Sequence, residues 1–225
     1  MTELEAVYAR HSVRRYQPVA VPNDKAEALI EKLAALNRES GLSLTFLRDA
    51  GDVFGRLMAR AMGLASAPSA ILCFGPDRPG LEEETGFYGE AAVLFAQQIG
   101  LNTCWVGMYN RKSALVVPPK GQRLTLAIAV GLGQDGGKPR NSKKTEQVSA
   151  GPDDKPAWFK KGIELSLLAP TAINQQKFLF TLREDGTVEL SGQEGPFYRV
   201  DLGIVKYHFL LGAREMGASP DVITV

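Results

Sequence analysis

Three polar residues near the start of the chain, Arg10, Ser12 and Arg14, occupy alternate positions and could together bind an anion. If this segment is extended, alternate side chains project to the same side of it. Two guanidinium groups with a hydroxyl between them then match the oxygens of a phosphate group. A solvated basic loop would have the same composition, so the residue types alone leave both interpretations open.

A second candidate segment, Ala169 to Phe178, carries side-chain amides at Asn174 and Gln176. Pro170 disfavours helix for the residue before it, so we expect the preceding apolar helix to end near Leu168. Each amide places donors and acceptors in one plane, which suits a flat heterocycle with polar groups along one edge. A helix-to-strand turn with solvated amides is the plainer interpretation of this segment, and it stays open.

A third polar run, Lys138 to Lys144, has the composition of a flexible charged connector, although an anion could also bind there. Just before it, Gly131 to Gly136 spells G-x-G-x-x-G after an apolar strand. A dinucleotide site needs a helix to begin within this motif, so that the helix N-terminus meets the pyrophosphate. The sequence continues Gly137-Lys138-Pro139 without helical periodicity, and we therefore reject a dinucleotide site.

The sequence shows no conventional catalytic or metal-binding set. Its two histidines, His11 and His208, have no zinc-ligand spacing with Cys73 or Cys104. His208 falls within an apolar helix and is interpreted as structural. Ser12 has no evident His and Asp partners for nucleophilic catalysis. A protein of this kind that does chemistry would take that chemistry from a cofactor.

The elements that must position these residues are predicted from apolar periodicity and turn residues. Asn23 or Asp24 is the expected N-cap of the second helix, Gly100 is the expected end of the central helix, and Asp185-Gly186 predicts a hairpin turn. We expect helices at 1–9, 26–36, 51–62, 85–99, 158–168 and 200–216, and strands at 42–47, 70–74, 124–130, 178–182 and 188–190.

Two apolar helical segments, Gly86 to Gly100 and Gly203 to Gly217, repeat each other, and a smaller helix followed by a strand precedes each. This order predicts an internal duplication, with a first repeat at 1–150, a shortened second repeat at 151–225 and a polar connector at 131–155. The residues that match in register are Gly86, Leu94, Ala96 and Gly100 with Gly203, Leu211, Ala213 and Gly217.

The composition is that of an ordinary soluble globular protein. Of the 225 residues, 44% are hydrophobic and 23% are charged, and the formal net charge is +1. This balance, with no aromatic residues among the basic runs, argues against nucleic-acid binding. The chain begins without a signal-peptide pattern, no apolar stretch approaches the roughly 20 residues of a membrane span, and two cysteines imply no disulfide framework. We therefore expect a cytoplasmic protein that binds no membrane.

Four segments together resemble the FMN-dependent nitroreductases. Arg10 to Arg14 is similar to their basic opening, and Thr85 to Gly107 resembles their central helix with the G-L-x-x-x-W-x-G turn after it. Lys138-Pro139-Arg140 with Lys143 resembles their basic segment after the last core strand. Ala169 to Phe178 is similar to the A-P-S-x-x-N-x-Q-P-W segment of the family.

The resemblance implies an α+β fold, with three layers α/β/α and a mainly antiparallel central sheet, and FMN as the cofactor. It implies that Arg14 lies near the ribityl chain or the pyrimidine edge of the flavin, and Arg60 is the nearest candidate for a further polar contact. The other cofactor-binding residues that it implies are Arg10, Ser12, Arg140 and Lys143 at the phosphate, and His11, Val106, Gly107, Pro170, Thr171, Ala172, Asn174 and Gln176.

The order of the segments departs from the usual family. There the A-P-S-x-x-N segment follows the first helix, whereas here Asn37 to Gly41 takes that place and the segment lies in the second repeat. Family members are usually homodimers whose FMN contacts both subunits. Resemblance to a subgroup with an internal pseudo-dimer implies that one chain supplies both sets of contacts and acts as a monomer.

The activity implied by the resemblance is an FMN oxidoreductase that takes hydride from NAD(P)H. Its acceptors would be nitroaromatics, quinones or similar small molecules. The flavin would carry the chemistry, so no catalytic side chain and no metal are expected. Two alternatives stay open, namely another flavin enzyme of the same fold and a non-catalytic protein that binds flavin or another anion.

Overall fold

The computed structural model describes residues 1–55, 63–64, 66–138 and 140–225. These residues group into two compact units. The first unit contains residues 1–81 and 91–139, and the second contains residues 82–90 and 140–225. One long helix, α4 (Leu81–Gln98), therefore contributes its first part mainly to the second unit and the rest to the first.

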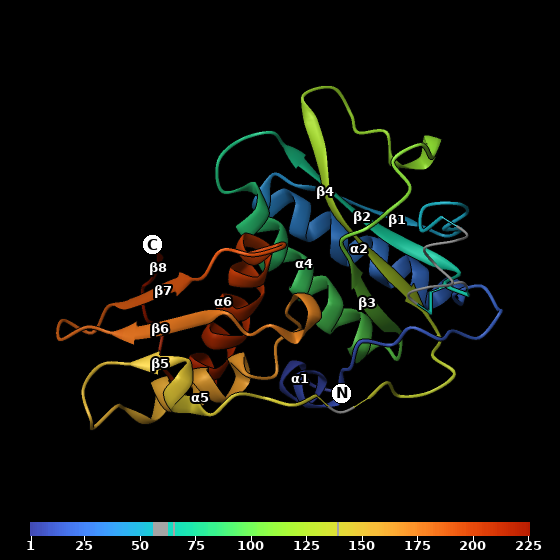
Figure 1. Ribbon diagram of the computed structural model, residues 1–225. Coiled ribbons are helices and arrows are strands. Elements are labelled where there is room, and N and C mark those ends of the chain that lie inside the picture. Colours follow the sequence, from blue (N-terminus) through green and yellow to red (C-terminus); the bar gives the residue numbers. More distant parts are fainter. Residues whose placement is uncertain (56–62, 65, 139) are drawn as a thin grey trace. The chain divides into compact units, whose positions relative to one another are not determined.

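The sheet of the first unit is antiparallel throughout, with its strands in the order β1-β2-β4-β3 (Figure 1). The strands are β1 (Ser43–Leu47), β2 (Ser69–Pro76), β3 (Asn102–Val106) and β4 (Gln122–Gly131). Among the described residues, the α-helices besides α4 are α1 (Glu3–Ala9) and α2 (Asn23–Ser40), and η1 (Ala114–Val116) is a 3-10 turn. β2 and β4 are the central strands, which accounts for their almost continuous burial. α2 contacts β1, and its buried residues Leu29, Leu33 and Leu36 recur at helical spacing.

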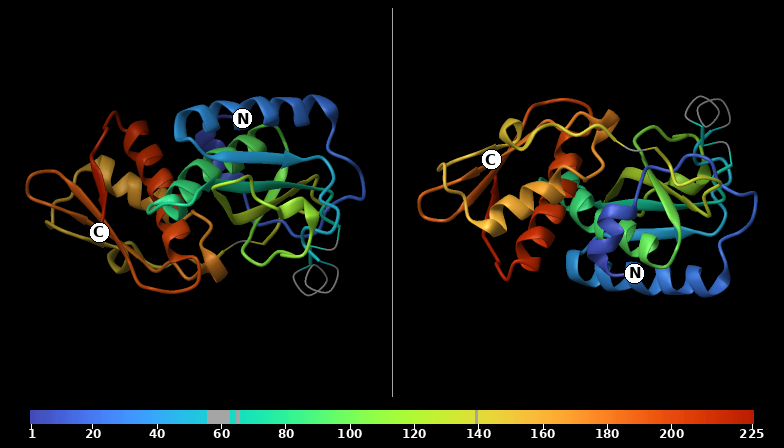
Figure 2. Two further views of the ribbon diagram at one scale, coloured as in Figure 1. Left: turned by 90° about the horizontal axis from the view of Figure 1, so that it is seen from above. Right: turned by 90° about the horizontal axis from the view of Figure 1, so that it is seen from below.

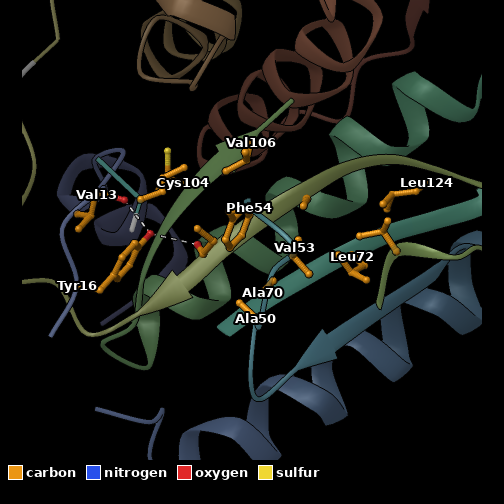
Figure 3. Packing of buried hydrophobic residues seen from close by; sticks show 14 of the residues in the cluster. Val13, Tyr16, Ala50, Val53, Phe54, Ala70, Leu72, Cys104, Val106 and Leu124 are labelled. Carbon is orange, nitrogen blue, oxygen red and sulfur yellow. Dashed lines mark hydrogen bonds between the residues drawn. The ribbon is translucent and has the colours of Figure 1, made fainter. Parts of the chain in front are cut away.

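A hydrophobic cluster joins the segment after α1 to this sheet (Figure 3). Val13 and Tyr16 of that segment are buried with Cys104 and Val106 of β3. The Tyr16 hydroxyl lies 2.7 Å from the carbonyl oxygen of Val13 and 3.3 Å from that of Ala129 in β4. Burial raises the pKa of Tyr16 well above its ordinary value, so the phenol stays a hydrogen-bond donor. Tyr16 thereby fixes residues 10–16 along the sheet.

The sheet of the second unit has mixed pairing, in the order β5-β6-β7-β8. Its strands are β5 (Ser149–Ala150), β6 (Phe178–Leu182), β7 (Val188–Gly192) and β8 (Val222–Thr224). β6 and β7 form the hairpin expected around Asp185-Gly186, where Gly186 has a φ of 87°. Helices α5 (Ala157–Ser166) and α6 (Tyr198–Glu215) pack side by side, and α6 contacts β7 (Figures 1 and 2).

The first part of α4 crosses α6 at a pair of glycines. A Cβ atom on Gly203 would lie 1.9 Å from the carbonyl oxygen of Glu83, and one on Gly86 would lie 2.0 Å from that of Val200. In each case the oxygen belongs to the residue three positions before the opposite glycine. The contacts are therefore reciprocal, as they would be between two copies of one helix, and only glycine permits so close an approach.

The α+β class and the antiparallel sheet are confirmed, and most predicted elements are present with their ends shifted by a few residues. The expected N-cap of α2 is wrong. Pro22 takes the cap position without a side-chain hydrogen bond, and Asn23 is already helical. The connector contains a 3-10 turn, η2 (Thr145–Gln147), and strand β5.

Two other expectations fall partly outside the described residues. In the helix expected at 51–62, residues 51–55 form turns, and residues 56–62 lie outside the described part of the chain. Arg60 therefore also lies outside it. Among the described residues, no helix has both the length and the apolar character that crossing a membrane would require.

Candidate functional site

The candidate anion-binding residues of the first unit lie on an extended segment beside β3. Ser12 forms an isolated parallel bridge with Thr103, and the amide of Val13 donates to the Thr103 carbonyl at 3.0 Å. Because the segment is extended, Val13 faces the core while its neighbours face away from it. The alternation predicted from the sequence is therefore present over these residues.

Arg10 and Ser12 are brought together by this geometry. Arg10 follows α1 as its C-cap residue, is 2% exposed, and donates from Nη2 to the Ser12 hydroxyl at 3.4 Å. Arg14 is exposed. Burial raises the pKa of the Cys104 thiol, and the nearby guanidinium groups of Arg14 and Arg10 act in the opposite direction. Both positive charges thus lie close enough to β3 to act on one of its side chains.

The remaining predicted residues of the first unit differ in how accessible they are. Val106 is fully buried at the end of β3, whereas Gly107 is partly exposed. His11 is also partly exposed, and a Cβ atom on Gly137 would lie 2.7 Å from the His11 Cβ. His11 therefore packs against the loop that follows β4.

The G-x-G-x-x-G motif is the end of β4 and a turn. The amide of Gly133 donates to the Asn102 side chain at 2.9 Å, and that of Gln134 donates to the Arg15 carbonyl at 2.9 Å. Arg15 also forms a salt bridge with Asp135 through Nε at 3.0 Å. The described residues that follow the motif, 137–138 and 140–144, form no helix, which agrees with the rejection of a dinucleotide site.

The candidate residues of the second unit include a strained turn between α5 and β6. Ile173 has a φ of 48°, Asn174 of 56° and Gln176 of 46°. Residues other than glycine seldom adopt such values, and a β-branched residue such as Ile173 does so least readily. The Ile173 side chain is 93% exposed, so packing does not compensate for this strain. Strain of this kind is concentrated at functional sites.

The two side-chain amides of this turn form hydrogen bonds within the protein, which the sequence did not predict. Asn174 Nδ2 donates to the Asn141 carbonyl at 2.7 Å, and Gln176 Nε2 donates to the same carbonyl at 2.9 Å. Gln176 Nε2 also donates to Asn174 Oδ1 at 2.9 Å, and the side chain is 2% exposed. Gln176 therefore shapes the turn, and both of its amide hydrogens are already engaged.

The basic segment at 140–144 is attached to the same turn. The Lys143 amide donates to Gln176 Oε1 at 2.8 Å, and Lys143 Nζ donates to the Gln176 carbonyl at 2.7 Å. Ser142 donates to the Leu167 carbonyl at 3.1 Å. Arg140 is partly exposed at the start of this segment. The structure thus brings Lys143, Asn174 and Gln176 into one hydrogen-bonded group.

Asp201 is the residue of this group that sequence reasoning missed. It lies in the first turn of α6, is 7% exposed, and accepts hydrogen bonds from the Ala172 amide and the Gln175 side chain. Burial raises its pKa to about 6, while these hydrogen bonds act in the opposite direction. An acidic residue near a helix start is an ordinary feature, so its burial could not be read from the sequence.

His208 is structural, as interpreted from the sequence. It is fully buried, with Nδ1 3.0 Å from the Leu165 carbonyl oxygen and Nε2 2.9 Å from Glu90 Oε1. All three residues belong to the second unit.

Taken one unit at a time, the donor sets fit the parts of a phosphorylated, flat-ringed ligand. In the first unit, Arg10, Ser12 and Arg14 supply guanidinium and hydroxyl donors of the kind that phosphate oxygens accept. In the second, the Ile173 side chain is exposed on the turn, whereas the side-chain amides of Asn174 and Gln176 are engaged within the protein. The turn therefore offers an apolar surface that suits the face of a flat ring.

Comparison with known proteins decides the family. The family described as "Putative TM nitroreductase" matches residues 3–213. The chain belongs to this family. Family membership confirms the resemblance to nitroreductases that the sequence segments indicated.

Solved structures of nitroreductases share the fold at low sequence identity. The putative nitroreductase of Thermotoga maritima has a TM-score of 0.67 and 23% identity, and the match covers 96% of this chain and 85% of that one. A putative nitroreductase of a Desulfovibrio desulfuricans subspecies, in complex with FMN, has a TM-score of 0.53 and 18% identity over 69% of this chain and 98% of its own.

A third structure, from Parabacteroides distasonis, is a putative NADH dehydrogenase/NAD(P)H nitroreductase. It has a TM-score of 0.52 and 21% identity over 65% of this chain and 95% of its own. Among proteins with curated descriptions, none matches this sequence. At these identities the structural matches show a common fold.

Proposed function

We propose that this protein is an FMN-dependent oxidoreductase that takes hydride from NAD(P)H and reduces small acceptors such as nitroaromatics or quinones. The observation that carries the proposal is the pairing of buried Arg10 with Ser12 on an extended segment, within the part of the chain that the nitroreductase family matches. The FMN bound by the Desulfovibrio relative supports the choice of cofactor.

The proposed phosphate contacts are the charged and hydroxyl groups described above. Arg10 and Ser12 would donate charge-assisted hydrogen bonds to the phosphate oxygens, with Arg140 and Lys143 as further cations. Arg14 is exposed and could reach past the segment toward the ribityl chain or the pyrimidine edge. A cation there would stabilise negative charge on a reduced ring.

When bound, FMN would supply the hydride chemistry, and the protein would hold the flavin ring. The chain would contribute the backbone of Val106 and Gly107, the partly exposed His11, and the turn that contains Pro170, Thr171, Ala172 and Asn174. Gln176 acts here by holding the turn, since its amide is engaged with Asn141 and Asn174.

We further propose that one chain provides all of these contacts as a monomer, in a cytoplasmic protein built as a pseudo-dimer with repeats at 1–150 and 151–225. Two observations support this. Nearly the whole Desulfovibrio chain, 98% of it, corresponds to only 69% of this chain. The reciprocal contacts of Gly86 and Gly203 are those expected of duplicated helices.

The proposed activity is tested by following the flavin in the purified, FMN-loaded protein. Under anaerobic conditions, NADH or NADPH should bleach the flavin absorption at about 450 nm, and a quinone or nitroaromatic compound should restore it. Comparison of the two nucleotides at equal concentration would identify the donor. Flavin that binds but is not reduced by either nucleotide would instead indicate a non-catalytic flavin-binding protein.

A further inference from the structure

Asp201 connects helix α6 to the strained turn at residues 171–176. The Ala172 amide lies 3.0 Å and 3.1 Å from its two carboxylate oxygens, and Gln175 Nε2 donates to Oδ2 at 2.7 Å. Gln175 Nε2 also donates to the Pro196 carbonyl at 3.1 Å. A carboxylate can only accept hydrogen bonds, so in each contact with Asp201 the turn supplies the donor and helix α6 supplies the acceptor.

The turn needs such external contacts because its own residues do not favour its shape. Positive φ angles at Ile173, Asn174 and Gln176 persist only where the surroundings impose them. On one side, Thr171 Oγ1 accepts a hydrogen bond from the backbone amide of Gln176 at 3.0 Å. The Asn141 carbonyl accepts hydrogen bonds from the side-chain amides of Asn174 and Gln176. On the other side, the contacts come from Asp201.

We propose that Asp201 is a positioning residue, which fixes the turn at residues 171–176 in the shape that receives the flavin by accepting hydrogen bonds from Ala172 and Gln175. The part of this inference that concerns flavin rests on the proposed function. The part that concerns the turn rests only on contacts within the second unit.

The environment of Asp201 fits a positioning role. Burying a carboxylate is costly unless hydrogen bonds offset it, and here burial raises the pKa of Asp201 while Gln175 and Ala172 lower it. Charged residues on the adjoining segments include Lys177, Glu194 and Arg199, together with Glu82, Glu83 and Glu84 in the first turn of α4. None of them is among the causes of the pKa shift of Asp201. The hydrogen bonds from the turn therefore offset part of the cost of burying this carboxylate.

The test is hydrogen–deuterium exchange of the full chain without added FMN at pH 7.5. Asp201→Asn should speed exchange at residues 170–178 by about tenfold or more, the size expected when a hydrogen bond to a charged group is lost. Gln175→Glu should do the same because two carboxylates would then face each other. Asp185→Asn is the matched control, since it removes the same charge from a hairpin turn of the same unit.

The double variant Asp201→Asn/Gln175→Glu reverses the polarity of the contact, since the asparagine amide can donate to the new carboxylate. It should slow exchange at residues 170–178 relative to both single variants, a recovery that a purely structural role would not give, although the bond from Gln175 to the Pro196 carbonyl stays lost. Unchanged exchange in both single variants, or loss of protection throughout the second unit without recovery in the double variant, would overturn the proposal. If Asp201→Asn does not fold, Gln175→Glu is compared with Gln175→Leu, which also loses the bond to the Pro196 carbonyl but places no second carboxylate beside Asp201. Faster exchange in Gln175→Glu than in Gln175→Leu is expected, and equal exchange in the two would overturn the proposal.

A separate titration at pH 7.5 tests the part that concerns flavin. Asp201→Asn should weaken FMN binding by about tenfold, and the double variant should recover most of that loss. Equal FMN affinity in the wild type and Asp201→Asn would overturn this part. Absence of FMN binding by the wild type would instead count against the proposed function, and the exchange experiment would still decide the role of Asp201 in the turn.

Discussion

At the scale of single residues, Arg10 is the side chain on which the proposed phosphate contact depends most. Arg10→Ala should weaken FMN binding by on the order of 1.5–3 kcal/mol, because it removes a charge-assisted hydrogen bond. Riboflavin has no phosphate and should bind both proteins about equally. Arg15→Ala is the control, because Arg15 carries the same charge, is exposed and is paired with Asp135. Equal losses for FMN and riboflavin would show that Arg10 does not contact the phosphate.

Asp201 gives a prediction about pH. Its pKa is about 6 in the folded chain and about 3.8 as a reference value, so between these values the folded state binds more protons than the unfolded state. The stabilisation from its protonation is complete below pH 3.8 and is lost as the pH rises through 6. Relative to Asp201→Asn, the free energy of unfolding of the wild type should therefore fall by up to about 3 kcal/mol between pH 3.5 and pH 7. Chemical denaturation of both proteins across this pH range tests the prediction. A difference in the free energy of unfolding between the wild type and Asp201→Asn that does not change with pH would contradict it.

The residue scale is also where the sequence was least informative. Arg10, Ser12 and Arg14 could be singled out because charge and spacing are visible in one dimension. Asp201 could not, since its importance comes from burial against Ala172 and Gln175. The engaged amide of Gln176 was likewise hidden, because its partner is a backbone carbonyl at Asn141, 35 residues away.

At the scale of helices and strands, long apolar runs were predicted well and short polar elements were not. β2, β4 and α6 each bury enough apolar residues to reveal their period. β5 and β8 contain two and three residues, and their pairing with β6 and β7 depends on the tertiary structure. The sequence predicted one central sheet, whereas the described strands form two sheets.

The crossing of α4 and α6 gives a prediction at this scale. Gly203→Ala and Gly86→Ala should each lower the free energy of unfolding by roughly 3 kcal/mol or more, because the added methyl group would lie about 2 Å from a backbone oxygen. Reciprocal contacts predict similar losses for both variants. Gly136→Ala is the control, since no atom lies within 4 Å of its added Cβ, and it should change stability by less than about 0.5 kcal/mol. Chemical denaturation measures the free energy of unfolding of all three variants. A wild-type value for Gly203→Ala or Gly86→Ala would contradict the close approach of α4 and α6.

At the scale of the whole molecule, the proposal of a functional monomer predicts that inactive variants do not complement each other. Arg10→Ala and Asn174→Ala alter residues that the sequence places in different repeats. If one chain provides all FMN contacts, mixing the two inactive proteins should leave activity at the level of either alone. In a homodimer with cross-chain sites, mixed dimers would contain one intact site. Recovery of activity on mixing would therefore refute the monomer proposal.

The most direct test of the account is a calorimetric titration of the flavin-free full chain with FMN, accompanied by a sedimentation measurement of its mass. We expect saturation at about one FMN per chain, with flavin bands at about 370 and 450 nm and the mass of a monomer. Two equivalent sites per chain would contradict the single complete set of contacts. No binding at all would contradict the central claim that this chain is a flavoprotein.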